Sequence, residues 1–242
     1  MYKGIYEFAN IKVEINSLYE YIHKMCAKYK ISNNEDVKYV INITEDDIKR
    51  ENEKSKGQEY IDFPLYYLET LAVYRKFLAF SIFENVFLFH SSSFMIDGKA
   101  YIITAPSGTG KSTHARFLSE VYKERFVCIN DDKPLIRYEN DEFMVYGTPW
   151  NGKHGLDNNV CYPLKAIFVL NRGEVDSVDK MIESVAFNFI FSQVHKPTGK
   201  DEMKLIINLL SKMAHSIHCY LLKATNRIEA TEASRKIIDN KN

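Results

Sequence analysis

A glycine-rich segment near the middle of the chain offers the clearest chemistry. Residues 105–113 read Ala-Pro-Ser-Gly-Thr-Gly-Lys-Ser-Thr and directly follow an apolar run at residues 100–104. The two glycines let successive backbone N–H groups turn inward without a Cβ clash, so they can form an anion nest at the start of a helix. The order of strand, glycine loop and helix predicts a P-loop that binds the phosphates of ATP. The alternative is a chance glycine turn between a strand and a helix.

Each residue of this loop has an expected role. Lys111 would supply a positive charge to the β- and γ-phosphates, and Ser112 would offer a hydroxyl to Mg²⁺. Ala105 stands where the pattern usually has its first glycine, and we expect its methyl group to be tolerated because this residue ends the strand. The residues expected to bind the nucleotide are Ser107, Gly108, Thr109, Gly110, Lys111, Ser112 and Thr113.

Two adjacent carboxylates follow the next apolar run. Residues 126–129 read Phe-Val-Cys-Ile and lead into Asn130, Asp131 and Asp132. A strand that comes directly after the P-loop helix would bring its carboxyl end back to the phosphates. Because side chains alternate along a strand, one aspartate could hold Mg²⁺ through a water while the other takes a proton from an attacking hydroxyl. Asp131 joins Ser112 as a candidate metal ligand, the division of roles stays open, and an ordinary turn is the alternative.

The loop and the aspartate pair together resemble a known family. The chain has a Ser-Gly-x-Gly-Lys loop, and Asn-Asp-Asp follows it after one helix and one strand. This arrangement is similar to the kinase domain of the HPr kinase/phosphorylase family. It is more distantly similar to phosphoenolpyruvate carboxykinase. The resemblance covers roughly residues 86–170. It implies ATP and Mg²⁺ as cofactors and a histidine near the catalytic aspartate, on the strand before the P-loop, where His90 matches. An edge-strand histidine without a catalytic role is the alternative for His90.

An irregular stretch after the aspartates departs from the HPr kinase pattern. Residues 147–155 read Gly-Thr-Pro-Trp-Asn-Gly-Lys-His-Gly and contain the only tryptophan of the chain. We expect a substrate loop that uses Trp150, Lys153 and His154, the alternative being a structural Ω-loop with Trp150 as its core anchor. Arg172 comes just after a predicted strand. It could neutralise charge in a transition state, or it could be an ordinary turn arginine.

The elements before the glycine loop divide into two groups. Alternation predicts strands at residues 11–15 and 37–43, and helical patterns cover residues 16–30 and 44–55. These elements form a small N-terminal α+β segment, residues 1–60. A long apolar helix then runs from Asp62, its expected N-cap, to about residue 83. It opens the second domain, residues 61–242.

The second domain is expected to be an α/β P-loop kinase domain of the HPr kinase/phosphoenolpyruvate carboxykinase type. Extended segments at residues 86–94 and 95–104 carry an Asp-Gly hairpin signal at Asp97, and another hairpin is expected around Asn140. Further strands are expected at residues 125–129, 164–170 and 217–222, and helices at residues 112–123, 183–194, 201–214 and 227–238.

Composition and charge exclude several classes of protein. Lysine and arginine number 32 and aspartate and glutamate number 32, so the formal net charge of zero leaves no field to gather nucleic acid or an anionic membrane. The longest apolar run, residues 77–83, has seven residues, far short of the roughly 20 that a membrane span needs. Four scattered cysteines form no CxxC pair, which indicates a reducing, cytoplasmic location rather than a disulfide framework.

The sequence therefore predicts a kinase that transfers the γ-phosphate of ATP to a hydroxyl, serine-like, on a peptide, a protein or a small molecule. The candidate catalytic residues are Asp131, Asp132, Lys111, His90 and Arg172. One alternative is a regulatory module that binds ATP without transferring phosphate. Another is a phosphorylase that works in reverse and produces pyrophosphate. No partner besides ATP and the acceptor is indicated, apart from a possible second copy of the chain.

Overall fold

The computed structural model describes residues 1–32, 36–55 and 63–240. The chain forms two compact units, Met1–Glu84 and Asn85–Asn242. The boundary therefore lies later than the expected one after residue 60. The reason is helix α3 (Leu65–Ser81), which buries Leu68, Val73 and Phe77 in the first unit.

The first unit contains a three-stranded sheet. Strands β1 (Tyr2–Phe8) and β2 (Ile11–Ser17) form an antiparallel hairpin, and β3 (Tyr39–Asn42) pairs parallel to β2. The expected helix over residues 16–30 is wrong in extent, because β2 continues to Ser17. Only α1 (Tyr21–Met25) and the 3₁₀ turn Ala27–Tyr29 are helical in that stretch.

Two helices complete this unit. Helix α2 (Glu45–Ser55) begins as expected after Thr44, whose hydroxyl accepts from the N–H of Asp47 at 3.3 Å while Asp47 Oδ2 accepts from the N–H of Thr44 at 2.9 Å. This reciprocal arrangement is a capping box. Helix α3 follows Pro64, and the N-cap expected at Asp62 lies outside the described residues.

The second unit is built around a large mixed sheet. In the described part of the chain, nine strands join in the order β4-β8-β9-β10-β6-β5-β7, with β12 paired to β10 and β11 paired to β12. Their bounds are β4 (Val86–Leu88), β5 (Ser92–Ile96), β6 (Lys99–Thr104), β7 (Phe126–Asn130), β8 (Leu135–Glu139), β9 (Glu142–Tyr146), β10 (Cys161–Arg172), β11 (Ser177–Lys180) and β12 (His218–Ala224). The unit is thus the mixed α/β fold that the sequence predicted.

Strand direction decides which strand ends share an edge of this sheet. Strand β5 is antiparallel to both β6 and β7, so β6 and β7 run in the same direction. Strand β10 is parallel to β6 on one edge, and its other edge pairs first with β9 and then with β12. The carboxyl ends of β6, β7 and β10 therefore lie at one edge of the sheet.

Both predicted hairpins of this unit are present. The turn between β5 and β6 has left-handed backbone at Asp97 (φ 51°) and Gly98 (φ 77°). In the turn between β8 and β9, Asn140 (φ 49°) and Asp141 (φ 62°) also have left-handed backbone. Two successive left-handed residues match the twist of a two-residue hairpin, and Asn, Asp and Gly tolerate them best.

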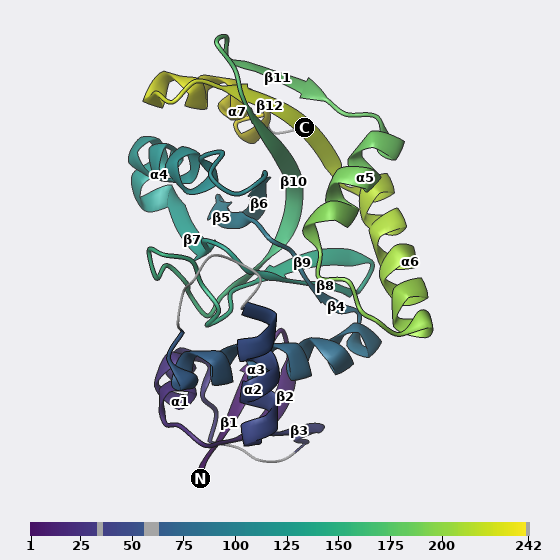
Figure 1. Ribbon diagram of the computed structural model, residues 1–242. Coiled ribbons are helices and arrows are strands. Elements are labelled where there is room, and N and C mark those ends of the chain that lie inside the picture. The colour runs from purple at the N-terminus through teal and green to yellow at the C-terminus, as the bar shows by residue number, and fades with distance from the viewer. Residues whose placement is uncertain (33–35, 56–62, 241–242) are drawn as a thin grey trace. The chain divides into compact units, whose positions relative to one another are not determined.

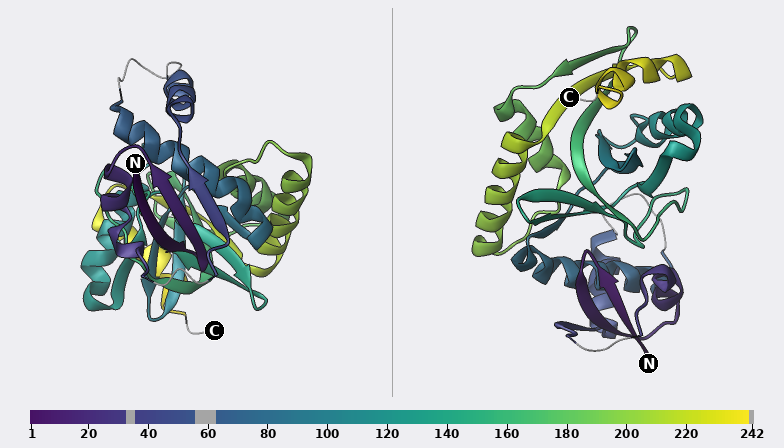
Figure 2. Two further views of the ribbon diagram at one scale, coloured as in Figure 1. Left: turned by 90° about the horizontal axis from the view of Figure 1, so that it is seen from below. Right: turned by 180° about the vertical axis from the view of Figure 1, so that it is seen from behind.

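Four helices cover the two faces of the sheet. They are α4 (Lys111–Tyr122), α5 (Glu183–Gln193), α6 (Lys200–Ser216) and α7 (Thr231–Ile238). Figure 1 shows α4 and α7 on one side of β10 and α5 and α6 on the other, and the view from behind in Figure 2 agrees. The described residues include no helix with the length and hydrophobicity needed to cross a bilayer.

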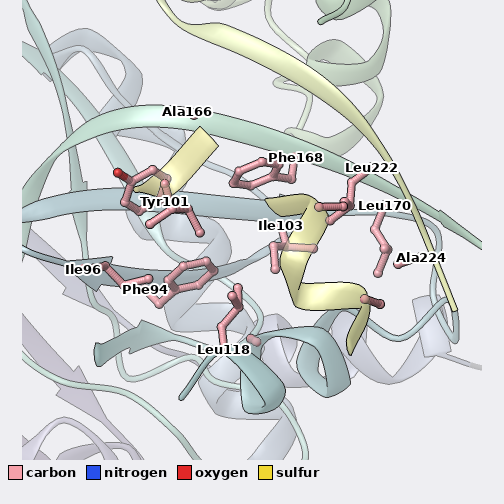
Figure 3. Close-up of a cluster of buried hydrophobic side chains, with 14 of the residues drawn as sticks. Phe94, Ile96, Tyr101, Ile103, Leu118, Ala166, Phe168, Leu170, Leu222 and Ala224 are labelled. Carbon is pink, nitrogen blue, oxygen red and sulfur yellow. The ribbon is translucent and has the colours of Figure 1, made fainter. Parts of the chain in front are cut away.

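A hydrophobic core fixes α4 against the sheet. Alternate residues of β10, namely Ala166, Phe168 and Leu170, face the same cluster as Leu118 of α4 and Ile103 of β6 (Figure 3). All five are buried. Because α4 follows the glycine loop directly, this packing also fixes where the loop opens.

Candidate functional site

The glycine loop leaves the carboxyl end of β6 and enters α4. Gly108 and Gly110 have left-handed backbone, with φ values of 79° and 107°. Gly110 is the residue before the first turn of α4, so the loop does end at a helix N-terminus as predicted. Ala105 is buried in the hydrophobic core, which explains why a methyl group is accepted at the position where the motif usually has glycine.

Two cations flank this loop. A Cβ built on Gly110 would lie 2.5 Å from Arg172 Nη2, so the Arg172 guanidinium packs on the bare backbone of that glycine. Arg172 is the last residue of β10 and reaches the loop from its carboxyl end. Lys111 Nζ donates to the carbonyl of Ala105 at 3.0 Å. Burial lowers the pKa of Lys111, and the negative charge of Asp132 partly opposes that change.

The predicted aspartate pair follows the carboxyl end of β7, at the same sheet edge. Asp131 is 5% exposed, and its Oδ1 accepts a hydrogen bond of 2.6 Å from the N–H of Gly152. Its Oδ2 is buried and has no hydrogen-bond partner within the described residues. A buried carboxylate oxygen without a partner is costly, so this atom is where a bound cation or donor would be most favourable.

The second aspartate has different neighbours. Asp132 Oδ1 lies 3.0 Å from His90 Nε2, and Lys133 Nζ forms an ion pair with Oδ2. Burial alone would raise the pKa of Asp132, but the hydrogen bond from His90 and the positive charge and hydrogen bond of Lys133 outweigh it and lower the pKa to about 2. Asp132 is therefore ionised at neutral pH and a weak base. The two carboxylates thus have different partners, although both residues lie beyond the end of β7 at Asn130, where the alternation of a strand no longer applies.

His90 reaches Asp132 from a connection rather than from a strand. The resemblance placed the histidine on the strand before the P-loop, whereas His90 lies between the ends of β4 and β5. Its backbone N–H donates to the carbonyl of Gln193, and its carbonyl accepts from the Thr104 hydroxyl at 3.1 Å.

Asn130 connects the aspartates to the loop of residues 147–155. Its side chain is fully buried, and its Nδ2 donates to the carbonyl of Thr148 at 2.9 Å and to Thr148 Oγ1 at 3.1 Å. Its Oδ1 accepts from the N–H groups of Asp132 and Lys133. One amide thus holds both segments in register. Asn130 was not among the predicted site residues; the signal that could have found it is a polar residue at the end of an apolar strand.

The predicted substrate loop divides into buried and exposed parts. Trp150 is 5% exposed and serves as an anchor, which was the alternative interpretation of this stretch. Lys153 and His154 are exposed. Gly152 lies against Asp131 so closely that a Cβ there would be 3.2 Å from Oδ2. The structure therefore brings the loop to the aspartates, but through its backbone rather than through the tryptophan.

A cavity of about 240 Å³ opens beside this constellation. Ser112 and Thr113 of α4 line it together with Asp131 and His154. Ser112 and Asp131 offer a hydroxyl and a carboxylate oxygen, which are ligand types that Mg²⁺ accepts. The described residues contain no group of three or more His, Cys, Asp or Glu side chains that could hold a metal ion by themselves.

Comparison with known proteins adds little to this picture. No family model matches the sequence. No curated relative matches it either. Among solved structures, the chain is similar to the Hpr(Ser) kinase/phosphatase from Coxiella burnetii, with 13% identity and a TM-score of 0.36, covering 63% of this chain and 99% of that chain. A TM-score this low supports no conclusion about the site, and the family resemblance stays a prediction.

Proposed function

We propose that this protein is an ATP-dependent kinase that transfers the γ-phosphate to a hydroxyl acceptor. The observation that carries the proposal is the convergence of three chemical groups at the carboxyl ends of three strands. A left-handed glycine loop with Lys111 follows β6, a carboxylate with an unpartnered oxygen follows β7, and Arg172 ends β10. Phosphoryl transfer needs such a set, because catalysis there is mostly positioning and charge stabilisation.

Each group has a role in the proposed reaction. The backbone N–H groups of residues 107–113 and the start of α4 would bind the phosphates. Lys111, now bonded to the Ala105 carbonyl, would turn to the β- and γ-oxygens, and Arg172 would stabilise charge on the transferred group. Ser112 would hold Mg²⁺ directly and Asp131 would hold it through a metal-bound water, and the ion would supply charge neutralisation between the phosphates.

The two aspartates differ in their proposed roles. Asp131 lines the same cavity as Ser112, and its buried Oδ2 has no hydrogen-bond partner among the described residues, so this is the oxygen that a bound acceptor hydroxyl or a metal-bound water would complete. Asp132 is held by His90 and Lys133, and its lowered pKa makes it a weak proton acceptor. We assign Asp132 to positioning and to keeping negative charge beside Lys111.

Titration calorimetry with Mg·ATP, followed by transfer of labelled γ-phosphate, tests the proposal. The parent protein is expected to bind Mg·ATP with micromolar affinity, and Lys111→Ala is expected to weaken binding by about a hundredfold or more, equivalent to about 3 kcal/mol. Lys153→Ala, at an exposed position of the neighbouring loop, is the charge-matched control. Absence of binding in the parent, or unchanged binding in Lys111→Ala, would overturn the proposal. Binding without any phosphate transfer would instead indicate a regulatory module.

A further inference from the structure

The cavity beside the glycine loop extends beyond Ser112, Thr113, Asp131 and His154. Its lining includes Ser112 and Ser119 of α4, which are about 10 Å apart along the helix axis. Phe126 and Cys128 of β7 line it as well. Because α4 runs back along the sheet from the loop, Ser112 lies at the end where β7 delivers Asp131. The cavity thus has a polar end at Ser112 and Asp131 and continues along α4 and β7.

We propose that this cavity is the acceptor site and that it takes a compact hydroxyl compound with a largely apolar, uncharged body. The hydroxyl lies at the Ser112 and Asp131 end, and the body lies against Phe126, Cys128 and Leu156. This inference rests on the proposed kinase function. It goes further by assigning the place and the chemical class of the acceptor.

The position of the unpartnered oxygen carries the argument. Asp131 is 95% buried and lines the cavity, and its Oδ2 has no hydrogen-bond partner among the described residues. An acceptor hydroxyl at this end would donate to that oxygen. The Arg172 guanidinium, by contrast, covers Gly110, and neither of these residues is among those that line the cavity. A carboxylate suits the attacking hydroxyl and a guanidinium suits phosphate, so the acceptor belongs on the β7 side.

The acceptor, ATP and Asp131 together account for every bond and proton in the proposed transfer. The acceptor oxygen forms a bond to the γ-phosphorus as the bond from that phosphorus to the β,γ-bridging oxygen breaks. The bridging electron pair leaves with ADP, and the hydroxyl proton goes to Asp131 Oδ2. ATP is the co-reactant that the proposed function supplies, and no oxidant or reductant is needed.

Size and charge define the class of acceptor. At about 240 Å³ the cavity is smaller than the 300 Å³ or more of an ordinary small-molecule pocket, so it holds a compact group. Arg116, the one Lys or Arg side chain among the lining residues, is paired with Glu120 at 2.5 Å, and Asp131 contributes a carboxylate, so the lining favours an uncharged body over an anionic one. A free small alcohol and a hydroxyl residue of a peptide present the same chemistry, and the experiment separates them.

Filling the cavity from two different elements tests the inference. Cys128→Phe fills it from β7 and Ser119→Phe fills it from α4. Cys161→Phe is the matched control, because Cys161 is an exposed strand cysteine outside the lining. In both filled variants we expect ATP hydrolysis by water to fall about tenfold or more, with the Mg·ATP Kd within about twofold of the parent. Transfer to N-acetyl-L-serinamide, and to a ten-residue serine peptide, should fall with it.

The outcomes separate the two levels of the proposal. Loss of Mg·ATP affinity in the filled variants would show that the nucleotide occupies the cavity, and this would overturn the inference. Hydrolysis or transfer at the parent rate in the filled variants would overturn it as well. A parent that neither binds nor turns over Mg·ATP would overturn the kinase function itself. Phosphorylation of the serinamide would show that a small free alcohol is a sufficient acceptor. Phosphorylation of the peptide but not of the serinamide would show that the acceptor hydroxyl must belong to a peptide chain.

Chemical labelling of Cys128 gives a second measurement that needs no turnover. In a Cys161→Ser background the remaining cysteines outside the cavity, Cys26 and Cys219, are buried. Alkylation of Cys128 by N-ethylmaleimide is expected to keep its rate within about twofold when a non-hydrolysable Mg·ATP analogue is bound. Protection of about tenfold or more by the analogue would place the nucleotide in the cavity and overturn the inference.

Discussion

Two buried carboxylates, one in each unit, have opposite surroundings. Glu69 of α3 is fully buried, and its two oxygens accept hydrogen bonds from the backbone N–H groups of Leu18 and Tyr19 at 2.5 and 3.1 Å. Asp131 is almost as buried, yet only one of its oxygens is bonded, to the N–H of Gly152. Both sites lie where a strand gives way to a loop. They differ in whether the fold alone completes the hydrogen bonding.

The difference separates a structural group from one that is open to a ligand. Glu69 ties the end of β2 to α3, and each of its two oxygens has a hydrogen-bond donor from the fold itself. Burial raises the pKa of Glu69 against the opposing effect of its two N–H donors. A buried oxygen left unbonded, as at Asp131, costs about 1–3 kcal/mol. A bound partner would remove this cost at Asp131 and has none to remove at Glu69, which is why Asp131 rather than Glu69 is the candidate for a functional role.

The largest effect is expected from Asp131→Asn. The amide keeps an oxygen for the Gly152 N–H and replaces the unbonded oxygen by NH₂, so the loop should stay in place. Phosphate transfer should fall about a thousandfold, equivalent to about 4 kcal/mol in the barrier, because neither a proton nor a cation can be accepted there. Initial rates with labelled ATP measure the loss.

Two further measurements sharpen this result. Mg·ATP affinity and the urea midpoint of Asp131→Asn should stay near those of the parent, because a buried charge has been removed without breaking a hydrogen bond. A rise in the magnesium concentration needed for half-maximal rate would assign Asp131 to the metal, and an unchanged one would assign it to the proton. Transfer at the parent rate would show that Asp131 serves neither.

The matched substitution Glu69→Gln should behave in the opposite way. One of the N–H groups of Leu18 and Tyr19 would face the new NH₂, so the first unit should lose up to about 3 kcal/mol of stability. Hydrogen exchange at those two amides measures the loss locally. Transfer per folded molecule should not change. If the Leu18 and Tyr19 amides of Glu69→Gln exchange hydrogen as slowly as those of the parent, the comparison between the two carboxylates does not hold.

Much of this site could be predicted because its signals are local. The glycine loop, the following helix and the aspartate pair are contiguous patterns, and the Asp97 and Asn140 hairpins carry turn residues that tolerate left-handed backbone. The hairpin between β1 and β2 went unpredicted because its turn contains Ala9, a residue type that rarely adopts the φ of 49° found there.

The rest depends on contacts between distant segments. Nothing near Asn130 in the sequence shows that its amide would bond to Thr148, or that Gly152 would approach Asp131. The burial of Trp150 depends equally on how that loop folds back. His90 could be matched only through a family pattern, and its ring meets Asp132 because a connection, not a strand, carries it. Pairing across a sheet is what sequence periodicity leaves undetermined.

His114 extends the comparison to a buried imidazole that the fold keeps neutral, and it gives the smallest expected effect. It lies on α4, is 3% exposed, and its Nε2 is 3.0 Å from Ser234 Oγ of α7. Burial lowers its pKa to about 4, with the Asp176 charge opposing and the Arg172 charge adding to the shift. The folded protein therefore keeps this ring neutral down to about pH 4, whereas the unfolded chain protonates it near pH 6.5.

This difference predicts a loss of stability as pH falls. Because the unfolded state binds the proton first, the contribution of His114 is unchanged above pH 6.5 and is lost progressively between pH 6.5 and about 4. Between pH 8 and pH 5 the loss is about 2 kcal/mol. The glutamine of His114→Gln can keep the hydrogen bond to Ser234 but cannot titrate. Between pH 8 and pH 5 the stability of this variant should therefore fall by about 2 kcal/mol less than that of the parent. Urea unfolding followed by the fluorescence of Trp150, the only tryptophan, reports on this unit. Equal pH dependence in both proteins would mean that the ring is protonated in the folded state, and that α4 is held less tightly than its packing implies.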